Sequence, residues 1–431
     1  MPPERRRKRH PAPPRVLIAS HGHPEITKGG AENAAFHLFE GLRERDTEAW
    51  FLGCGAPAGQ GAELCITQPF SAREFLYAPG AFNWFNFANR DPRMPRELER
   101  LLVELAPDIV HFHHYAGLGV EAFDIVRRVL PNAAIVLTLH EFLAICHHFG
   151  QMVTRPDLHL CRRATETRCA ACFPEIAPGD FFLRRRYIQG FLDRVDQFIA
   201  PSAFLAERYV QWGVPEARMA VVENVLPEAT VAPPVRPAGH TLLVGFFGQI
   251  SRLKGIEILL DAAGALAAEG HNSISFAVFG DYRSQPEVFR LDVAKRLATP
   301  GSNVSFHGPY DHTEVDALMG GVDAVLVPSI WWENAPLVIE EALRNRRPVL
   351  CSDIGGMAEK VRDGIDGFHF RMGSAHALAD LLRRLDADRG LLSTVSATMR
   401  APTPPAPTLD AHLDLYRRLL TENPGVYSRL A

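Results

Sequence analysis

Two cations lie two positions apart in the stretch GQISRLKG (residues 248–255). Arg252 and Lys254 fall between an apolar run that ends at Gly248 and an amphipathic run that begins near Gly255. Two side-chain cations and the positive end of an incoming helix can together neutralise a diphosphate, which carries charge on both phosphoryl groups. The stretch therefore predicts an anion site, and a pair of solvated surface cations is the alternative.

Two carboxylates occur in PSIWWENAPLVIEEALRN (residues 328–345), where a strand-like run gives way to a helical pattern. Glu333 precedes the expected helix, and Glu341 lies one to two turns inside it. Carboxylates accept hydrogen bonds from vicinal hydroxyls, and the turn at 334–337 offers backbone N–H groups at a helix start. This segment is suited to hold a pair of sugar hydroxyls and a phosphate.

Gly29 and Gly30 stand directly before a helical pattern in HGHPEITKGGAEN. A glycine pair at that point lets backbone amides approach a ligand closely. The spacing is not GxGxxG, so it gives little support to a nicotinamide or flavin cofactor. A plain tight turn is the alternative.

Two histidines end apolar runs in the first half of the chain: His113 in DIVHFHH and His140 in AIVLTLH. An imidazole at the end of a strand is a candidate catalytic group. The alternative is a structural role, in which the ring only caps the sheet.

Short apolar runs alternate with longer amphipathic stretches along the chain, which is typical of strand–helix–strand units in parallel sheets. The alternation stops at PEATVAPPVRPAGH, whose four prolines indicate a linker, and then restarts. We expect an α/β protein with two doubly wound domains and a ligand in the cleft between them. The expected segments are a disordered basic tail (1–14), a first domain (15–230) with a Cys-rich insertion (146–172), a linker (231–240), a second domain (241–400), and a connector with a helix that packs back toward the first domain (401–431).

The sequence resembles the retaining glycosyltransferases of family 4, whose GT-B fold places two Rossmann-like doubly wound domains face to face across a cleft. The resemblance covers nearly the whole chain. It rests on the order and spacing of several motifs: the Gly-Gly-Ala-Glu loop, GQISRLKG, FHGPY, the Glu-x7-Glu segment, and RPVLCSDIGGMAEKV followed by DGIDGFHF.

The resemblance implies a role for each matching residue. Arg252 and Lys254 match the pair that binds the donor diphosphate and stabilises the leaving nucleotide. Glu341 matches the carboxylate that holds the ribose hydroxyls, and Glu333 matches the one that faces the donor sugar. The family's sugar-contacting histidine most resembles His113, with His140 beside it on the acceptor side. The remaining implied donor contacts are Gly29, Gly30, Gly248, Gly308, Pro309, Tyr310, Asn334, Ala335, Pro336 and Leu337.

The implied enzyme is a retaining hexosyltransferase. It would move a sugar from a nucleotide-sugar, with UDP- and GDP-sugars as the expected donors, to a glycan, lipid-linked or other hydroxyl acceptor in polysaccharide or glycoconjugate synthesis. The leaving phosphate is expected to help deprotonate the acceptor. No catalytic metal is expected, because Arg252, Lys254 and helix ends take the place of a cation. The alternatives are a sugar-nucleotide 2-epimerase of the same fold and a non-catalytic sugar-nucleotide-binding protein.

Four of the seven cysteines cluster as Cys146, Cys161, Cys169 and Cys172. The Cys169–x2–Cys172 pair with two further thiols is a candidate structural zinc set, although the first two spacings are irregular. Unligated cysteines in a loop are the alternative. A reducing cytoplasm would disfavour disulfides.

Composition and charge set further limits. The 431 residues are 47% hydrophobic and 22% charged, and the formal net charge of −4 argues against a nucleic-acid partner held by a basic face. No apolar run of about 18 residues occurs, so we expect a cytoplasmic protein. The cations at 5–9 and the aromatic segment 70–92 leave open a peripheral contact with the inner face of a membrane, or stacking on an acceptor sugar. The alternatives are a solvated tail and ordinary core packing.

Overall fold

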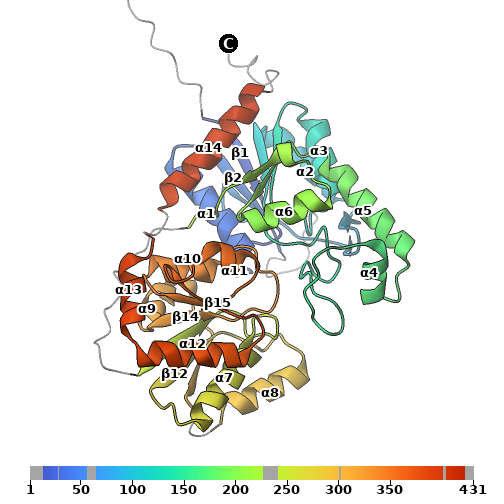
Figure 1. The fold of residues 1–431 in the computed structure, drawn as a ribbon. Coiled ribbons are helices and arrows are strands. Elements are labelled where there is room, and N and C mark those ends of the chain that lie inside the picture. Colours follow the sequence, from blue (N-terminus) through green and yellow to red (C-terminus); the bar gives the residue numbers. More distant parts are fainter. Residues whose placement is uncertain are drawn as a thin grey trace, which may run out of the picture.

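Two α/β units, drawn one above the other in Figure 1, make up the computed structural model. The structure describes residues 13–27, 29–55, 65–226, 241–299, 302–400 and 404–422. The expected linker at 231–240 and nearly all of the expected basic tail lie outside these residues.

The first sheet has the strand order β10-β9-β8-β7-β1-β2-β4-β3 in the described part of the chain. Neighbouring strands are parallel except for the antiparallel pair β3 and β4. The central strands are mostly apolar and buried along their whole length, as expected for a parallel sheet with helices on both faces. The strands are β1 (Val16–Ala19), β2 (Ala49–Cys54), β3 (Ile66–Ser71), β4 (Glu74–Tyr77), β7 (Ile109–Phe112), β8 (Ala134–Thr138), β9 (Gln197–Ala200) and β10 (Met219–Val221).

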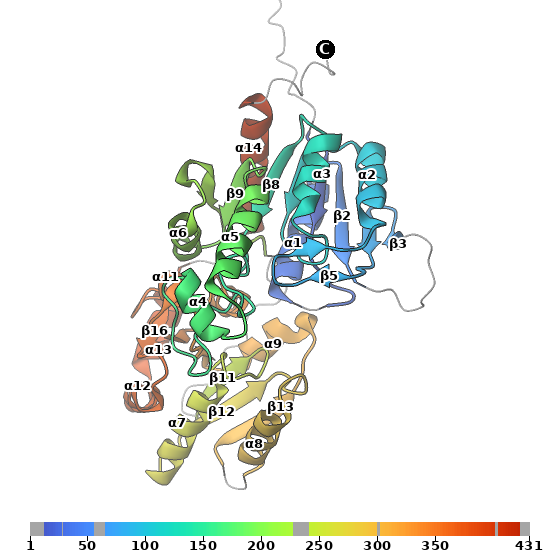
Figure 2. The same ribbon diagram turned by 90° about the vertical axis from the view of Figure 1, so that its right-hand side faces the viewer.

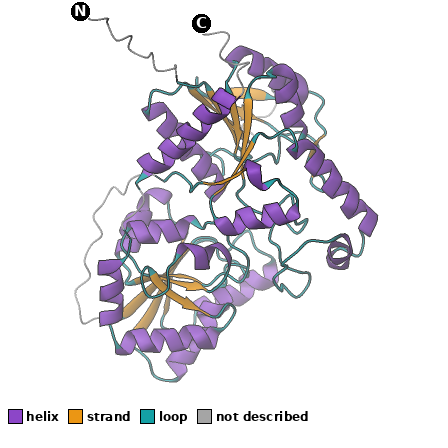
Figure 3. Ribbon diagram, turned by 45° about the horizontal axis from the view of Figure 1, so that its top comes forward, coloured by secondary structure: helices purple, strands orange, loops and turns teal. Residues whose placement is uncertain are grey.

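Amphipathic helices cover this sheet on both sides (Figure 3). In α2, the buried residues Met94, Leu98, Leu101, Leu102 and Leu105 recur every three or four positions, which places them on one helix face. The elements are α1 (Gly30–Glu44), the hairpin of β5 (Phe82–Asn83) and β6 (Ala88–Asn89), α2 (Met94–Leu105), α3 (Glu121–Val129), α4 (Glu166–Cys172), α5 (Pro178–Leu192), α6 (Ala203–Trp212) and η1 (Glu216–Arg218).

The second sheet is parallel throughout its described strands, in the order β13-β12-β11-β14-β15-β16. A single apolar cluster joins its strands to the helices around it. The elements are β11 (Leu242–Phe247), α7 (Ile256–Ala268), β12 (Ile274–Phe279), α8 (Glu287–Leu297), β13 (Val304–Gly308), η2 (His312–Glu314), α9 (Val315–Gly320), β14 (Ala324–Val327), α10 (Leu337–Arg344), β15 (Val349–Ser352), α11 (Gly355–Lys360), β16 (Gly367–Phe370), α12 (Ala375–Ala387) and α13 (Gly390–Thr398).

The last helix, α14 (Pro405–Glu422), crosses back to the first unit, where it lies beside α1 in Figure 1. Its apolar face, which includes Leu409, Leu413 and Leu420, joins the cluster formed by β1, β2 and α1. The hydroxyl of Tyr416 lies 2.6 Å from Nδ1 of the buried His111 on β7. The second half of the chain therefore contributes to the core of the first domain.

The aromatic segment at 70–92 divides between core and surface. Phe75, Tyr77 and Phe87 are buried, as core packing requires, whereas Phe70 and Trp84 are 41% and 60% exposed. Among the described helices, none combines the length and the hydropathy needed to cross a bilayer.

Candidate active site

A cavity of about 450 Å³ lies between the two units. Its walls are formed by loops that follow β1, β7 and β8 in the first unit and β11 and β14 in the second, and these carboxyl ends are where open α/β sheets bind ligands. The first unit contributes His21, Gly29, Gly30, Ala31, Glu32, Asn33, His114, His140, Glu141, Phe142 and Asn224; the second contributes Phe247, Gly248, Gln249, Lys254, Tyr310, Trp331, Trp332, Glu333, Asn334, Ala335, Pro336, Leu337, Val338 and Glu341.

Lys254 and Glu333 meet in this cavity. Nζ of Lys254 lies 2.6 Å from Oε1 of Glu333, whose side chain is only 6% exposed. The hydroxyl of Ser329 and the indole N–H of Trp331 donate to the same oxygen, each at 2.8 Å. Because the three donors converge on Oε1, the carboxylate is fixed in position and Oε2 can accept a hydrogen bond from a sugar hydroxyl.

A glycine at the start of α7 permits this meeting. Gly255 has φ +75°, and a Cβ at that position would stand 1.9 Å from the carbonyl oxygen of Pro328. Only glycine tolerates both the left-handed backbone and the close approach. The loop that carries Lys254 can therefore lie directly against the segment that leads to Glu333.

The N-termini of α10 and α1 face the same cavity, one from each unit. A Cβ on Gly30 would lie 3.6 Å from Cδ1 of Leu337, the first residue of α10. Each helix start presents backbone N–H groups and a partial positive charge. Together with Nζ of Lys254 they place several N–H donors at one cavity, an arrangement that can hold an anion. Inside α10, burial raises the pKa of Glu341 to about 7.

The side chain of Asn334 connects the two units, a role that its place in the sequence does not predict. Its Oδ1 accepts a hydrogen bond from the hydroxyl of Ser202 at 2.6 Å, and its Nδ2 donates to the carbonyl oxygen of His140 at 3.3 Å. Both partners belong to the first unit. Nearby, the carboxylate of Glu359 accepts hydrogen bonds from two backbone N–H groups at the start of α6. These contacts fix the distance between the first sheet and the loop 328–336 that joins β14 to α10, which is called the donor loop below.

The two predicted histidines have different positions. His140 lines the cavity, whereas His113 is 3% exposed and lies behind it, with its Nδ1 3.0 Å from Nε2 of His140. The expectation that both rings point into the cleft is therefore wrong for His113. Successive side chains of a strand point to opposite faces, so His111 and His113 share the face toward α14 and His114 points the other way, toward the cavity.

His114 and Glu141 form a pair on the cavity wall that we did not predict. Nε2 of His114 lies 3.2 Å from Oε1 of Glu141. Burial lowers the pKa of His114 well below its usual value and raises the pKa of Glu141 to about 8, so at neutral pH the pair is a neutral carboxylic acid beside a neutral imidazole. His114 directly follows His113 and Glu141 directly follows His140, and this adjacency is the one feature of the local sequence that could have pointed to the pair.

His21 and Glu32 form a second pair, with 3.2 Å between Nε2 and Oε1. Burial raises the pKa of Glu32, but hydrogen bonds from His21 and other neighbours outweigh it and leave the pKa lowered. This carboxylate is therefore ionised near neutral pH. The first unit thus offers the cavity both a charged and an uncharged acidic side chain.

Comparison with known proteins agrees with this geometry. Residues 28–228 match the family model described as Glycosyltransferase Family 4, and residues 233–399 match that of Glycosyl transferases group 1. The D-inositol 3-phosphate glycosyltransferase of Mycobacterium tuberculosis is 31% identical over 359 residues, covering 74% of this chain and 72% of that protein. The chain belongs to glycosyltransferase family 4. It also matches the Alpha-D-kanosaminyltransferase of Streptomyces kanamyceticus at 28% identity over 164 residues, which are 38% of this chain and 41% of that protein.

Solved structures confirm the GT-B fold of this glycosyltransferase. Anabaena HepE, solved in complex with UDP, superposes with a TM-score of 0.62 at 17% identity and covers 96% of this chain and 99% of its own. Sucrose-phosphate synthase from Thermosynechococcus elongatus gives a TM-score of 0.65 at 18% identity, covering 97% and 99%. The predicted architecture of two Rossmann-like domains across a cleft is confirmed.

Three predicted donor residues are not among the described residues that line the cavity of the glycosyltransferase. Arg252 is 57% exposed and pairs with Glu257 in the first turn of α7, with 3.1 Å between Nε and Oε2. To reach a ligand in the cavity it must leave this partner. Gly308 and Pro309 also lie off the wall, but the turn they form, in which Gly308 has φ +83°, delivers the ring of Tyr310 to it.

The four clustered cysteines line one cavity of about 340 Å³, separate from the interdomain cavity. All seven cysteines of the glycosyltransferase are free thiols. In the described residues, no three His, Cys, Asp or Glu side chains stand at the spacing that would hold a metal ion. Burial raises the pKa of Cys146 to about 11 and that of Cys169 to about 12, so neither is a ready nucleophile at neutral pH.

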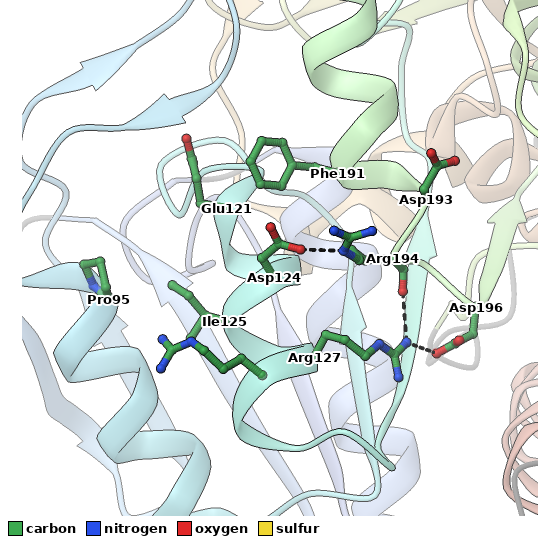
Figure 4. A pocket seen from close by; sticks show the side chains of 10 residues that line it. Pro95, Glu121, Asp124, Ile125, Arg127, Phe191, Asp193, Arg194 and Asp196 are labelled. Carbon is green, nitrogen blue, oxygen red and sulfur yellow. Dashed lines mark hydrogen bonds and ion pairs between the residues drawn. The ribbon is translucent and has the colours of Figure 1, made fainter.

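A larger hollow of about 890 Å³ lies on the first domain between α2, α3 and α5 (Figure 4). Four of its charged side chains form two ion pairs: Arg194 with Asp124 at 2.6 Å, and Arg127 with Asp196 at 2.7 Å. Figure 4 shows both pairs joining α3 to the segment that follows α5. These ion pairs therefore hold α3 against the segment that follows α5. The hollow differs from the interdomain cavity, where the N-termini of two helices converge.

The raised pKa of the buried Glu141 should appear in the pH dependence of the free energy of unfolding. Its pKa of about 8 in the folded protein lies above the ordinary value of 4.5, so the folded state holds more protons between these pH values. Stability should therefore fall as pH rises from about 4.5 to 8. Glu141→Gln removes this contribution, and we expect it to be about as stable as wild type at pH 5 but about 2–4 kcal/mol more stable at pH 8.5. Urea unfolding at the two pH values measures the difference; parallel profiles would contradict the assignment.

Proposed function

We propose that this glycosyltransferase moves a sugar from a UDP- or GDP-sugar to a hydroxyl of a glycan or lipid-linked acceptor, with retention of anomeric configuration. One observation carries the proposal: Lys254, a buried pair of glutamates and two helix N-termini from different domains converge on one cavity. The cavity volume of about 450 Å³ is within the range of small-molecule sites.

In the proposed complex, the donor diphosphate lies between Lys254 and the starts of α10 and α1. Arg252 joins the diphosphate after leaving Glu257. Glu341 accepts hydrogen bonds from the ribose hydroxyls, and Oε2 of Glu333 accepts one from the donor sugar. As the bond to the leaving group breaks, negative charge grows on the diphosphate, and these fixed positive groups stabilise it more strongly than in the ground state. We propose that they make a catalytic metal unnecessary.

The proposed retaining route uses the leaving phosphate to take the proton of the acceptor hydroxyl. The titration of the neighbouring groups supports this. Burial lowers the pKa of His140 to about 3, and at neutral pH Glu141 is largely protonated, so neither is a good general base. They can still position the acceptor by hydrogen bonds. The acceptor then enters from the first-domain side, past His21 and His114.

A polysaccharide or glycoconjugate product is the class we propose. The basic N-terminal segment and the exposed Phe70 and Trp84 would allow a peripheral contact with the cytoplasmic face of a membrane when the acceptor is lipid-linked.

The test has two stages. A thermal-shift screen of UDP-, GDP- and ADP-sugars should find a donor that stabilises the protein by about 2–3 kcal/mol at 100 times its Kd. UDP-sugars head the screen because HepE, of the same fold, was solved with UDP and with UDP-glucose. Transfer from that donor to a panel of acceptors, with the product analysed by NMR, should give the same anomeric configuration as the donor. An inverted product would refute the retaining route.

The same screen addresses the two alternatives, which the comparisons do not favour. A 2-epimerase would convert the bound nucleotide-sugar without any acceptor. A non-catalytic binding protein would be stabilised by a nucleotide-sugar but would release no nucleotide with any acceptor in the panel.

A further inference from the structure

The segment between β8 and α5 is held to the core only in part: its first residues, among them Phe142 and Ile145, are buried in the first-domain cluster, but its one helix is not. Residues 139–177 contain one short helix, α4, and an isolated bridge between Val153 and Leu160. None of the seven residues of α4 is buried. A helix of this length with no buried face is marginal in water, and a long excursion without regular structure is unusual in a compact domain.

The cysteines of this segment gather around α4, the helix without buried residues. Cys169 and Cys172 lie three positions apart on α4, so both thiols are on one face of the helix. Cys146 and Cys161 come from the preceding loops and line the same cavity of about 340 Å³. The other three cysteines, Cys54, Cys65 and Cys351, are buried in the domain cores.

We propose that Cys146, Cys161, Cys169 and Cys172 bind one structural zinc ion as a tetrahedral four-thiolate site that holds α4 and its loops in place. The thiols do not stand at ligand spacing in the structure. A change of χ1 rotamer moves a cysteine sulfur by about 3 Å, and the cavity provides room for that movement. Zinc then takes four thiolates at about 2.3 Å each, and the thiol protons are released to solvent.

The charge around the cavity suits such a site. A zinc ion with four thiolates carries a net charge of about −2. Arg155 and Arg168 line the cavity, and their guanidinium groups would offset this charge. His147 and His148 line it too, and the contact of Nδ1 of His148 with the carbonyl oxygen of Val153 at 3.1 Å leaves only Nε2 of that ring for a metal. We assign the four thiols because they supply a complete four-thiolate set by themselves.

The proposed site connects directly to the donor loop. The carbonyl oxygen of Cys161 accepts a hydrogen bond from the indole N–H of Trp332 at 3.2 Å, and Trp332 precedes Glu333. The next carbonyl, of Arg162, accepts one from Arg208 at 3.0 Å. In Figures 1 and 2, α4 lies at the end of α5 nearer to the second domain. Metal loss should therefore loosen the support of the donor loop as well as α4.

Elemental analysis of the full chain, purified without added metal, tests the proposal independently of transferase activity. We expect about one zinc per chain in the wild type and at least a tenfold loss in Cys169→Ser and Cys172→Ser. Cys65→Ala, which changes a buried cysteine outside the set, and His148→Ala should keep the zinc. Cys172→His should restore binding, because imidazole is also a zinc ligand, and this variant separates loss of a ligand from loss of fold.

Three results would overturn the proposal. The first is a wild-type chain that holds less than about a tenth of a zinc after equilibration with zinc and gel filtration, with its four thiols reactive. The second is full zinc content in the Cys169→Ser/Cys172→Ser double variant. The third is iron with sulfide in place of zinc, which a visible absorption spectrum would reveal.

Discussion

Replacing Lys254 by Ala is expected to lower turnover about 30- to 1,000-fold, because a charge-assisted contact to the leaving diphosphate in a partly dry cleft is worth about 2–4 kcal/mol in the transition state. The fold should survive, since Oε1 of Glu333 keeps its hydrogen bonds from Ser329 and Trp331. Steady-state transfer from the best donor, together with thermal midpoints, measures both effects.

Two matched variants sharpen this prediction. Lys295→Ala removes an exposed lysine of α8 and should leave turnover within about twofold of wild type. Arg252→Ala should lower it about tenfold, less than Lys254→Ala, because Arg252 must first give up its pairing with Glu257. Near-wild-type turnover in Lys254→Ala would refute the assignment of Lys254 to the donor diphosphate, on which the proposed site is centred.

Gly356→Ala is expected to destabilise the protein by about 3 kcal/mol or more and to abolish donor binding. A Cβ at this position would lie 1.5 Å from the carbonyl oxygen of Asn334, and the neighbouring atoms belong to backbone. The backbone N–H of Gly356 also donates to the carbonyl oxygen of Glu333 at 2.8 Å. The added methyl group must push the donor loop away from α11, and both glutamate and asparagine move with it.

The control is Gly264→Ala, in the middle of α7. A Cβ there would meet nothing within 4 Å, and alanine is favoured over glycine in a helix by up to about 1 kcal/mol. This variant should be as stable as wild type or slightly more so. Thermal unfolding with and without the donor compares the two. If Gly356→Ala has the thermal midpoint of the wild type and the same increase in midpoint with the donor, the donor loop can move without loss of stability or of donor binding, and the prediction is wrong.

Much of this site could be predicted from local sequence, because its chemistry lies at the ends of strands. Gly248, Lys254 and Glu333 lie in loops that follow recognisable strands, Glu341 lies inside the next helix, and the structure brings all four to the interdomain cavity. The order of the elements also determined that both sheets are mainly parallel, since apolar strands that alternate with amphipathic helices can be arranged in few other ways.

The orientation of individual side chains required the structure. Whether His113 or His114 reaches the cavity depends on where the strand pleat ends, and a shift of one residue exchanges them. The exposed position of Arg252 depends on its ion pair with Glu257, which holds the guanidinium outside the cavity.

The sequence by itself determined the family, the two-domain α/β architecture and the cations and carboxylates of the donor loops, because these depend on neighbours within a few residues. Only the tertiary structure determined the contact of Ser202 with Asn334 between the domains, and the neutral pair of His114 and Glu141 in a buried wall of the first domain. Ser202 and Asn334 are 132 positions apart, so no local pattern could pair them. The pKa of Glu141 depends on how much water the folded chain excludes, and burial of that kind is a property of packing.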